Sequence, residues 1–270
     1  MNMENEIRKL FHKYGSDKGG HEYSEVYFSY LEKLKDKNLT ILEIGIADGN
    51  SIKAWSEYFV NSKIVGIDIK KINKEEKKLN KSNVYLHQGS QSDKNFIKEI
   101  VNEYKEFDII IDDGSHFPKD VIKSFNLLFP FLKTNGLYFV EDTQTSYIHF
   151  FHGNPFDLKY ANTHMNFFKQ LTDSLNYQEI ANPFYIKKKY DSKIVNISFY
   201  HNLVVVKKGD NKKQSNLVLD NSYENKRYIT KINRSGQKFK YFVKYKILFK
   251  TYTLILYLFY TIKKIILLRF

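Results

Sequence analysis

The chain has 270 residues, enough for one substantial α/β domain with a buried core and extensions. It contains no cysteine, which excludes a disulfide framework, cysteine-ligated zinc and thiol catalysis and fits an intracellular protein. The net charge is +13, but from Lys207 onward 16 Lys and Arg oppose three acidic residues, so the preceding body holds 27 of each sign and is neutral. A neutral body argues against a nucleic-acid-binding domain.

The first residues of the chain are polar and acidic, without the basic start and apolar centre of a secretory signal. We therefore expect a cytoplasmic protein.

Short apolar runs rich in β-branched residues alternate with longer amphipathic stretches between Thr40 and Val206, a pattern typical of strands and crossover helices. The predicted strands are Thr40 to Gly45, Lys63 to Ile69, Asn83 to His87, Asp108 to Asp112, Gly136 to Glu141, Lys193 to Tyr200 and Leu203 to Lys207. The predicted helices are Ser51 to Phe59, Asp93 to Tyr104 and Pro118 to Leu132. Ile109 to Ile111 is apolar on both faces, as strands buried between two helix layers are. The pattern predicts a parallel, doubly wound sheet.

The last two predicted strands are separated by about two residues, His201 and Asn202. Such a short link joins only antiparallel strands, because a parallel pair needs a crossover. A seven-stranded, mostly parallel sheet that ends in an antiparallel hairpin resembles the methyltransferase variant of the Rossmann-like architecture. The segment 143–192 is a long insertion before this hairpin, and we expect it to shape the substrate site.

A turn rich in small residues follows the first predicted strand and leads into a helix. Small residues let the backbone approach a ligand, and Glu43 offers a carboxylate at the strand end. The spacing Glu-x-Gly-x-Ala-x-Gly resembles the first motif of class I methyltransferases, with Ala47 in place of the middle glycine. It does not match the Gly-x-Gly-x-x-Gly of dinucleotide sites. The resemblance implies that S-adenosylmethionine binds here, with these predicted contacts: Glu43, Gly45, Gly49 and Ser51.

Polar residues also follow the second and third predicted strands. Asp68 ends the second strand, where a carboxylate can accept hydrogen bonds from ribose hydroxyls. Gln91 follows the third strand and is a candidate contact for the adenine. The alternative for this segment is a helix cap by Ser92 or Asp93.

Two acidic segments follow the fourth and fifth predicted strands, and parallel strands bring such ends together. Asp113, Glu141 and Asp142 would repel one another unless a cation lay between them, so we predict a divalent metal site. Oxygen ligands favour Mg²⁺, with Mn²⁺ or Ca²⁺ as alternatives. His116 is the predicted general base, and Asp112 supports the cofactor side or the turn. The alternative makes both aspartates turn residues and His116 a helix cap.

A family resemblance rests on four segments: Tyr14-Gly15-Ser16-Asp17-Lys18-Gly19 with His21 and Tyr23, the Glu43 to Gly49 turn, Asp112 to His116, and Glu141 to Tyr147. The chain resembles the metal-dependent sugar O-methyltransferases of macrolide and aminocoumarin tailoring and related methyltransferases of bacterial surface-glycan loci. The resemblance implies that Asp113, Glu141 and Asp142 hold the metal, that His116 is the base and that Asp68 holds the ribose. The segment from Tyr14 to Lys18 is expected to fold over the cofactor or the substrate.

The carboxyl-terminal part changes character: a polar stretch at 211–237 precedes a segment at 238–270 that mixes Lys with Phe, Tyr, Leu and Ile. Lys250 and Lys263 bracket only 12 residues, fewer than the roughly 20 apolar residues of a spanning helix. The composition predicts an interfacial helix at an anionic membrane, or alternatively a helix that packs on protein. The predicted organisation is a helical cap (1–38), a methyltransferase domain (39–209) and a basic tail (210–270).

The function predicted from these features is metal-dependent O-methylation of a sugar hydroxyl, on a nucleotide sugar or on a capsule or lipopolysaccharide glycan. One alternative is methylation of a catechol-like small molecule, because a metal-bound diol serves both reactions. Another is an inactive methyltransferase fold that acts as an adaptor in glycan assembly, although an adaptor needs no metal site. No nucleic-acid partner is expected, and the oligomeric state stays open, with a homo-oligomer allowed.

Overall fold

The computed structural model describes residues 5–71, 83–180 and 185–212 and five positions of the tail: Thr251, Leu254, Ile255, Leu258 and Thr261. The predicted basic tail lies otherwise outside the described residues. The chain divides into one unit of Met1–Leu175 with Ser192–Asn211 and another of Asn176–Asp191 with Lys212–Phe270. The first unit ends close to the predicted domain end at 209, and it includes the N-terminal helices that were predicted as a cap.

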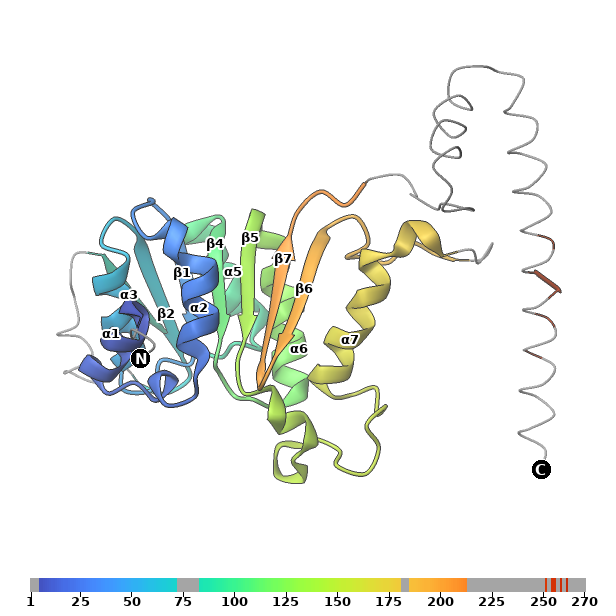
Figure 1. The fold of residues 1–270 in the computed structure, drawn as a ribbon, viewed down its shortest axis with the longest axis horizontal. Coiled ribbons are helices and arrows are strands. Elements are labelled where there is room, and N and C mark those ends of the chain that lie inside the picture. Colours follow the sequence, from blue (N-terminus) through green and yellow to red (C-terminus); the bar gives the residue numbers. More distant parts are fainter. Residues whose placement is uncertain are drawn as a thin grey trace, which may run out of the picture. The chain divides into compact units, whose positions relative to one another are not determined.

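A seven-stranded sheet forms the centre of the first unit (Figure 1), with the strand order β3-β2-β1-β4-β5-β7-β6. The first five strands are parallel, and β7 pairs antiparallel with both β5 and β6. The strand bounds are β1 Thr40–Ile44, β2 Lys63–Asp68, β3 Val84–Gln88, β4 Phe107–Asp112, β5 Leu132–Val140, β6 Ile194–Tyr200 and β7 Leu203–Lys208. The predicted mostly parallel sheet with an antiparallel hairpin at its end is confirmed.

Helices cover both faces of this sheet. Their bounds are α1 Glu6–Tyr14, α2 Tyr23–Leu31, α3 Asn50–Tyr58, α5 Lys94–Tyr104, α6 Pro118–Leu128 and α7 His164–Leu175. Short 3-10 helices are η1 Asp17–Gly19, η2 Glu32–Leu34, η3 Phe129–Phe131, η4 Thr143–Tyr147 and η5 His149–Phe151, with η6 Tyr177–Glu179 in the second unit.

The two layers follow from the alternation of side chains along the strands. Phe139 of β5 belongs to the core that α1, α2 and α3 share, where the ring centroids of Tyr27 and Phe139 are 4.7 Å apart. The next residue back, Tyr138, points to the opposite face and meets Phe125 of α6, with ring centroids 4.9 Å apart. The N-terminal helices are therefore an integral part of the core.

Three elements differ most from the sequence prediction. The helix that starts at Pro118 ends at Leu128 rather than Leu132, and β5 begins at Leu132 rather than Gly136. The insertion at 143–192 contains α7, which was not predicted. Its buried side chains, His164, Phe168 and Leu171, recur at helical spacing, but the aromatic and Asn-rich surroundings obscured the pattern.

Among the described residues, no helix combines the length and the apolar character that a bilayer crossing requires.

Candidate active site

A cavity of about 520 Å³ opens at the carboxyl ends of β1, β2 and β4, where the Rossmann-like fold binds its ligands. Its walls come from the turn after β1, the ends of β2 and β3, the β4–α6 loop and the N-terminal segment before α2. The predicted site residues that line it are Gly45, Ser51, Asp68, Gln91, Asp113, His116 and Asp142. The other four predicted residues, Glu43, Gly49, Asp112 and Glu141, are not part of its wall.

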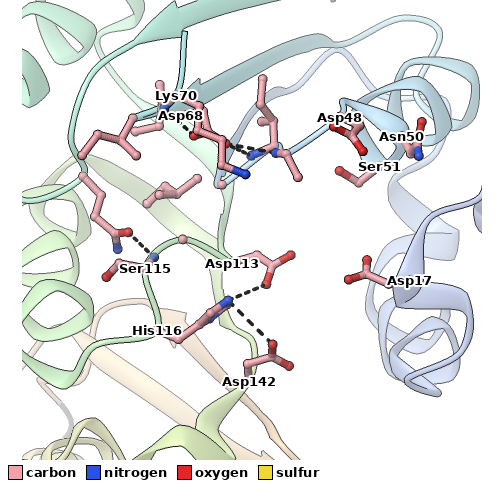
Figure 2. Close-up of a pocket in the computed structure, with 18 of the residues that line it drawn as sticks. Asp17, Asp48, Asn50, Ser51, Asp68, Lys70, Asp113, Ser115, His116 and Asp142 are labelled. Carbon is pink, nitrogen blue, oxygen red and sulfur yellow. Dashed lines mark hydrogen bonds and ion pairs between the residues drawn. The ribbon is translucent and has the colours of Figure 1, made fainter. Parts of the chain in front are cut away.

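The turn after β1 requires glycine at its start. Gly45 has a φ of 79°, and a Cβ atom there would lie 2.0 Å from the carbonyl oxygen of Asp113. Asp68 closes the same turn from β2, because its Oδ2 accepts hydrogen bonds from the amides of Ile46 and Ala47, both at 3.0 Å (Figure 2). Its Oδ1 accepts from the amide of Lys70. The predicted ribose acceptor thus also determines the shape of the turn.

Glu43 lies behind this turn and is fully buried. Its Oε2 accepts a hydrogen bond from the Ser51 hydroxyl at 3.0 Å, which ties β1 to the first turn of α3. Burial raises the pKa of Glu43 to about 7, while the nearby Lys18 ammonium opposes that shift. Glu43 therefore supports the turn from below rather than facing the cavity.

Asp112 and Gln91 form a second buried support. Asp112 accepts hydrogen bonds from Ser124, from the Tyr138 hydroxyl at 3.1 Å and from Gln91 Nε2 at 3.0 Å. Burial raises the pKa of Asp112 to about 6. Gln91 Oε1 accepts from the Ser115 amide at 2.7 Å, so this side chain connects the end of β4 to the β4–α6 loop.

Two aspartates and one histidine of the cavity wall form a cluster near the carboxyl ends of β4 and β5. Ligand atoms of Asp113, His116 and Asp142 lie within 4.8 Å of one another. His116 Nε2 is 3.9 Å from Asp113 Oδ1 and 3.7 Å from Asp142 Oδ2 (Figure 2). His116 and Asp142 adopt left-handed φ values of 58° and 53°, a costly conformation that is concentrated at functional sites.

Glu141, the third predicted metal ligand, occupies a different position. It is buried, and its Oε1 accepts hydrogen bonds from Lys18 Nζ at 2.8 Å and from the Tyr27 hydroxyl. Burial, with the negative charge of Asp113, raises its pKa well above the usual range. The structure thus gathers Asp113, His116 and Asp142 at the cavity and places Glu141 behind them.

Lys18 is a residue to which the sequence assigned no specific role. It is 2% exposed, and its ammonium donates to Asp113 Oδ2 as well as to Glu141. Burial lowers the pKa of Lys18, but Asp113, Glu141 and Glu43 overcome that effect and raise it well above the ordinary value. The family motif from Tyr14 to Gly19 drew attention to this segment. Its position in the sequence, however, gave no reason to expect contact with the acids that follow β4 and β5.

The sequence of the chain matches one known protein family over the part that forms the site. A family model described as FtsJ-like methyltransferase matches residues 26–173. That range contains β1 to β5 and every predicted site residue.

Curated relatives of known activity are similar to most of this chain. Mycinamicin VI 2''-O-methyltransferase of Micromonospora griseorubida is 31% identical over 76% of this chain and 53% of its own length. Demethylmacrocin O-methyltransferase of Streptomyces fradiae is 32% identical over 76% of this chain and 54% of its own length. The chain therefore spans about half the length of the curated relatives it matches.

A solved structure shares the fold closely. The MycE methyltransferase of the mycinamycin biosynthetic pathway, described in complex with Mg and SAH, is 28% identical with a TM-score of 0.74. The match covers 84% of this chain and 60% of that one.

Proposed function

The chain belongs to the FtsJ-like methyltransferase family, and from this membership we propose that it is an S-adenosylmethionine-dependent O-methyltransferase that acts on a sugar hydroxyl with the help of a divalent metal ion. The observation that carries the proposal is one cavity with the glycine turn and Asp68 at one end and the group of Asp113, His116 and Asp142 at the other. The named activities of the relatives, which include methylation of rhamnosyl and olivosyl compounds, support the choice of acceptor.

The cofactor would lie along the turn after β1. Gly45 allows close approach of its backbone, and Asp68 Oδ1 has a lone pair left for a ribose hydroxyl, since it accepts only one of the backbone bonds described above. Gln91 lines the cavity beside the predicted adenine position while it braces Ser115. Glu43 and Asp112 hold these walls from behind.

The donor set at the other end fits a hard divalent cation. Asp113 and Asp142 offer carboxylate oxygens at the cavity wall. The Lys18 ammonium is shared among Asp113, Glu43 and Glu141, so its one positive charge does not neutralise this group of acids. Asp113 and Asp142 would hold the ion, with Glu141 as the predicted third carboxylate. A bound Mg²⁺ supplies Lewis acidity that lowers the pKa of an acceptor hydroxyl.

His116 would remove the proton from the acceptor hydroxyl. Its Nε2 faces the two carboxylates at 3.7 and 3.9 Å, an arrangement that stabilises the imidazolium once the proton has arrived. The cofactor would supply its sulfonium methyl group to the sugar oxygen, which would leave S-adenosylhomocysteine as the second product. The protein's role is to hold the oxygen, the methyl group and the base in line.

The acceptor in this proposal is a nucleotide-activated sugar or a growing capsule or lipopolysaccharide glycan. Aromatic side chains beside the base are suited to the apolar face of a sugar. The ring of Phe151 lies 6.3 Å from that of His116 and 5.6 Å from that of Phe117. The same rings would also stack on a catechol, which is the small-molecule alternative.

The test of this function is incubation of the full chain with labelled S-adenosylmethionine and a panel of nucleotide sugars and catechols, with and without Mg²⁺, followed by mass analysis. We expect one methyl group on a sugar oxygen and loss of the product on addition of chelator. Methylation of catechols alone would select the small-molecule alternative. Cofactor binding without any transfer would favour the adaptor.

We also propose that the protein works in the cytoplasm and that its basic tail contacts the anionic inner face of the membrane. The five described tail positions are helical, and Ile255 and Leu258 are 58% and 53% exposed. Truncation after Asn211 should abolish binding to vesicles that contain anionic lipid. Equal partitioning of both chains would favour a tail that packs on protein.

A further inference from the structure

Apolar side chains that face solvent are concentrated on the insertion that follows β5. Phe150 of η5 is 77% exposed, and Phe156 in the loop after it is 95% exposed. Exposed apolar groups that cluster on one segment mark a binding surface, whereas isolated ones do not. The large exposed apolar residues of this segment are Tyr147, Ile148, Phe150, Phe156, Leu158 and Tyr160.

A series of rings leads from the proposed base to this surface. The ring centroid of Phe151 lies 6.3 Å from that of His116, and the centroid of Phe150 lies 5.3 Å from that of Phe151. Exposure rises along the series, since the His116 side chain is 23% exposed, Phe151 is half-buried and Phe150 is 77% exposed. The rings therefore continue outward from the reacting end of the cavity to solvent.

Backbone contacts hold these rings in place. The amides of Phe151 and Gly153 both donate to the carbonyl of Ile148, at 3.1 and 3.0 Å. A Cβ atom on Gly153 would lie 2.3 Å from the Thr145 carbonyl oxygen, so the end of η5 packs directly on η4. The Thr145 hydroxyl in turn donates to the carbonyl of His116 at 3.0 Å. The rings of η5 therefore have a set position relative to the base.

The segment that carries the rings has little charge. Residues 143–163 contain one acid, Asp157, and one lysine, Lys159, so their net charge is zero with neutral histidines. Among the described lysines that line the cavity, Lys18 is paired with carboxylates and Lys70 follows β2 on the cofactor side. The diphosphate of a nucleotide sugar needs cations or backbone amides. An uncharged ring needs neither.

We propose that Phe150 forms a subsite for the sugar ring next to the one that is methylated, so that the acceptor is a neutral oligosaccharide or the end of a growing glycan rather than a nucleotide sugar. The inference deepens the proposed function and rests on it. The C–H face of a pyranose is apolar and stacks on an aromatic ring while the hydroxyl groups stay in water. The planes of Phe150 and Phe151 are 86° apart, so each presents a separate face. Phe151 and His116 adjoin the reacting sugar, and Phe150 binds the next one.

The test offers one accepted sugar in three forms: as a methyl glycoside, as a nucleotide sugar and as the terminal unit of a disaccharide methyl glycoside. The sugar comes from a panel of hexoses and 6-deoxyhexoses, and the full chain is assayed with S-adenosylmethionine and Mg²⁺. We expect kcat/KM for the disaccharide to exceed that of both other forms roughly tenfold, since one stacked ring changes affinity by about that factor. The gain should lie mainly in KM, because the second ring is remote from the reacting atoms.

Phe150→Leu removes the flat ring but keeps an apolar side chain at an exposed position, so it should fold as the wild type does. It should abolish the preference for the disaccharide over the methyl glycoside, and Phe150→Tyr should restore it. Phe156→Leu is the matched control, because Phe156 is exposed on the same insertion but lies outside the ring series. Equal preference in Phe150→Leu and the wild type would overturn the proposal.

Two further results would assign the surface to another occupant and would also overturn the proposal. A phenyl glycoside that is preferred over the disaccharide would make the subsite one for an aromatic group joined to the sugar. A wild-type dimer in analytical ultracentrifugation that Phe150→Leu dissociates would make the surface a contact between two copies of the chain.

Saturation-transfer difference NMR separates failure of the subsite from failure of the proposed function, because it detects bound sugar without methyl transfer. Disaccharide binding that is lost in Phe150→Leu and retained in Phe156→Leu would support the subsite even if no sugar is methylated. Methylation of single sugars without any preference for the disaccharide would leave the proposed function standing and refute the subsite. If no sugar binds and none is methylated, both proposals fail.

Discussion

At the β1–β2 end of the cavity the walls are shaped by backbone amides, whereas at the β4–β5 end they are shaped by side chains from distant parts of the chain. The turn after β1 depends on Gly45 and on the bonds from Ile46 and Ala47 to Asp68, which is 22 residues or fewer away. The acid group depends on Lys18, 95 residues from Asp113 and 123 from Glu141.

This difference predicts how amino-acid substitutions at each end of the cavity should affect ligand binding. The turn has two supporting carboxylates, Asp68 and Glu43, and the bonds to Asp68 come from backbone amides, which substitutions of Ile46 and Ala47 leave in place. The acidic end holds several buried charges whose positions depend on one another, so a change in one shifts the others. We expect metal binding to be more sensitive to substitution than cofactor binding.

The largest effect is expected from loss of both cavity carboxylates. Asp113→Asn/Asp142→Asn should abolish Mn²⁺ binding and reduce methyl transfer roughly 10⁴-fold, because a bound metal contributes several kcal/mol to the transition state. Activity assays and Mn²⁺ titration measure the two losses. Asp157→Asn is the control, since Asp157 is an exposed carboxylate in the loop beyond η5. Retained activity that is insensitive to chelator would disprove the metal site.

Loss of the base should have the next largest effect. His116→Gln should lower kcat about 10³-fold, in the middle of the range for general bases, with cofactor affinity unchanged. His201→Gln, in the exposed β6–β7 turn, is the matched control. The measurement is single-turnover methyl transfer at saturating cofactor and Mg²⁺. Normal turnover in His116→Gln would assign the proton transfer to another group.

At the opposite end, Asp68→Ala should weaken S-adenosylmethionine binding roughly 10- to 100-fold. The carboxylate bonds to two turn amides and its predicted bond to the ribose are each worth about 1.5–3 kcal/mol at most. Mn²⁺ affinity should stay at the wild-type value, which calorimetry of both ligands can establish. A parallel loss of metal affinity would show that the two ends are not separate.

Sequence patterns predicted the parts of the molecule that depend on local rules. The β1 turn could be predicted because its glycine spacing and the acid at the end of the next strand follow from βαβ geometry. The metal set Asp113, Glu141 and Asp142 was predicted from the ends of neighbouring strands, and the family resemblance implied the same set. Sequence could not show that Glu141 turns toward Lys18, because that depends on how α1 and α2 pack against β5.

Helix α7 also packs against the acidic end of the cavity. The smallest predicted effect concerns this helix and the pH dependence of the free energy of unfolding. The amide of Met165 donates to the Ser146 hydroxyl at 3.0 Å, which ties the start of α7 to η4 directly after Asp142. His164 beside it is fully buried, and burial lowers its pKa to about 4 from the ordinary 6.5. The packed helix therefore contains a neutral imidazole.

Because the folded pKa of His164 is depressed, the stability it contributes is complete above pH 6.5 and is lost as the pH falls toward 4. Over the first pH unit below 6.5 the free energy of unfolding should fall by about 1 kcal/mol through this group. His164→Leu should remove that slope in urea unfolding at each pH, whereas His201→Leu, in the exposed β6–β7 turn, should retain it. If the free energy of unfolding depends on pH equally in the two variants, groups other than His164 cause the acid sensitivity. In that case α7 would stabilise the acidic end through packing alone.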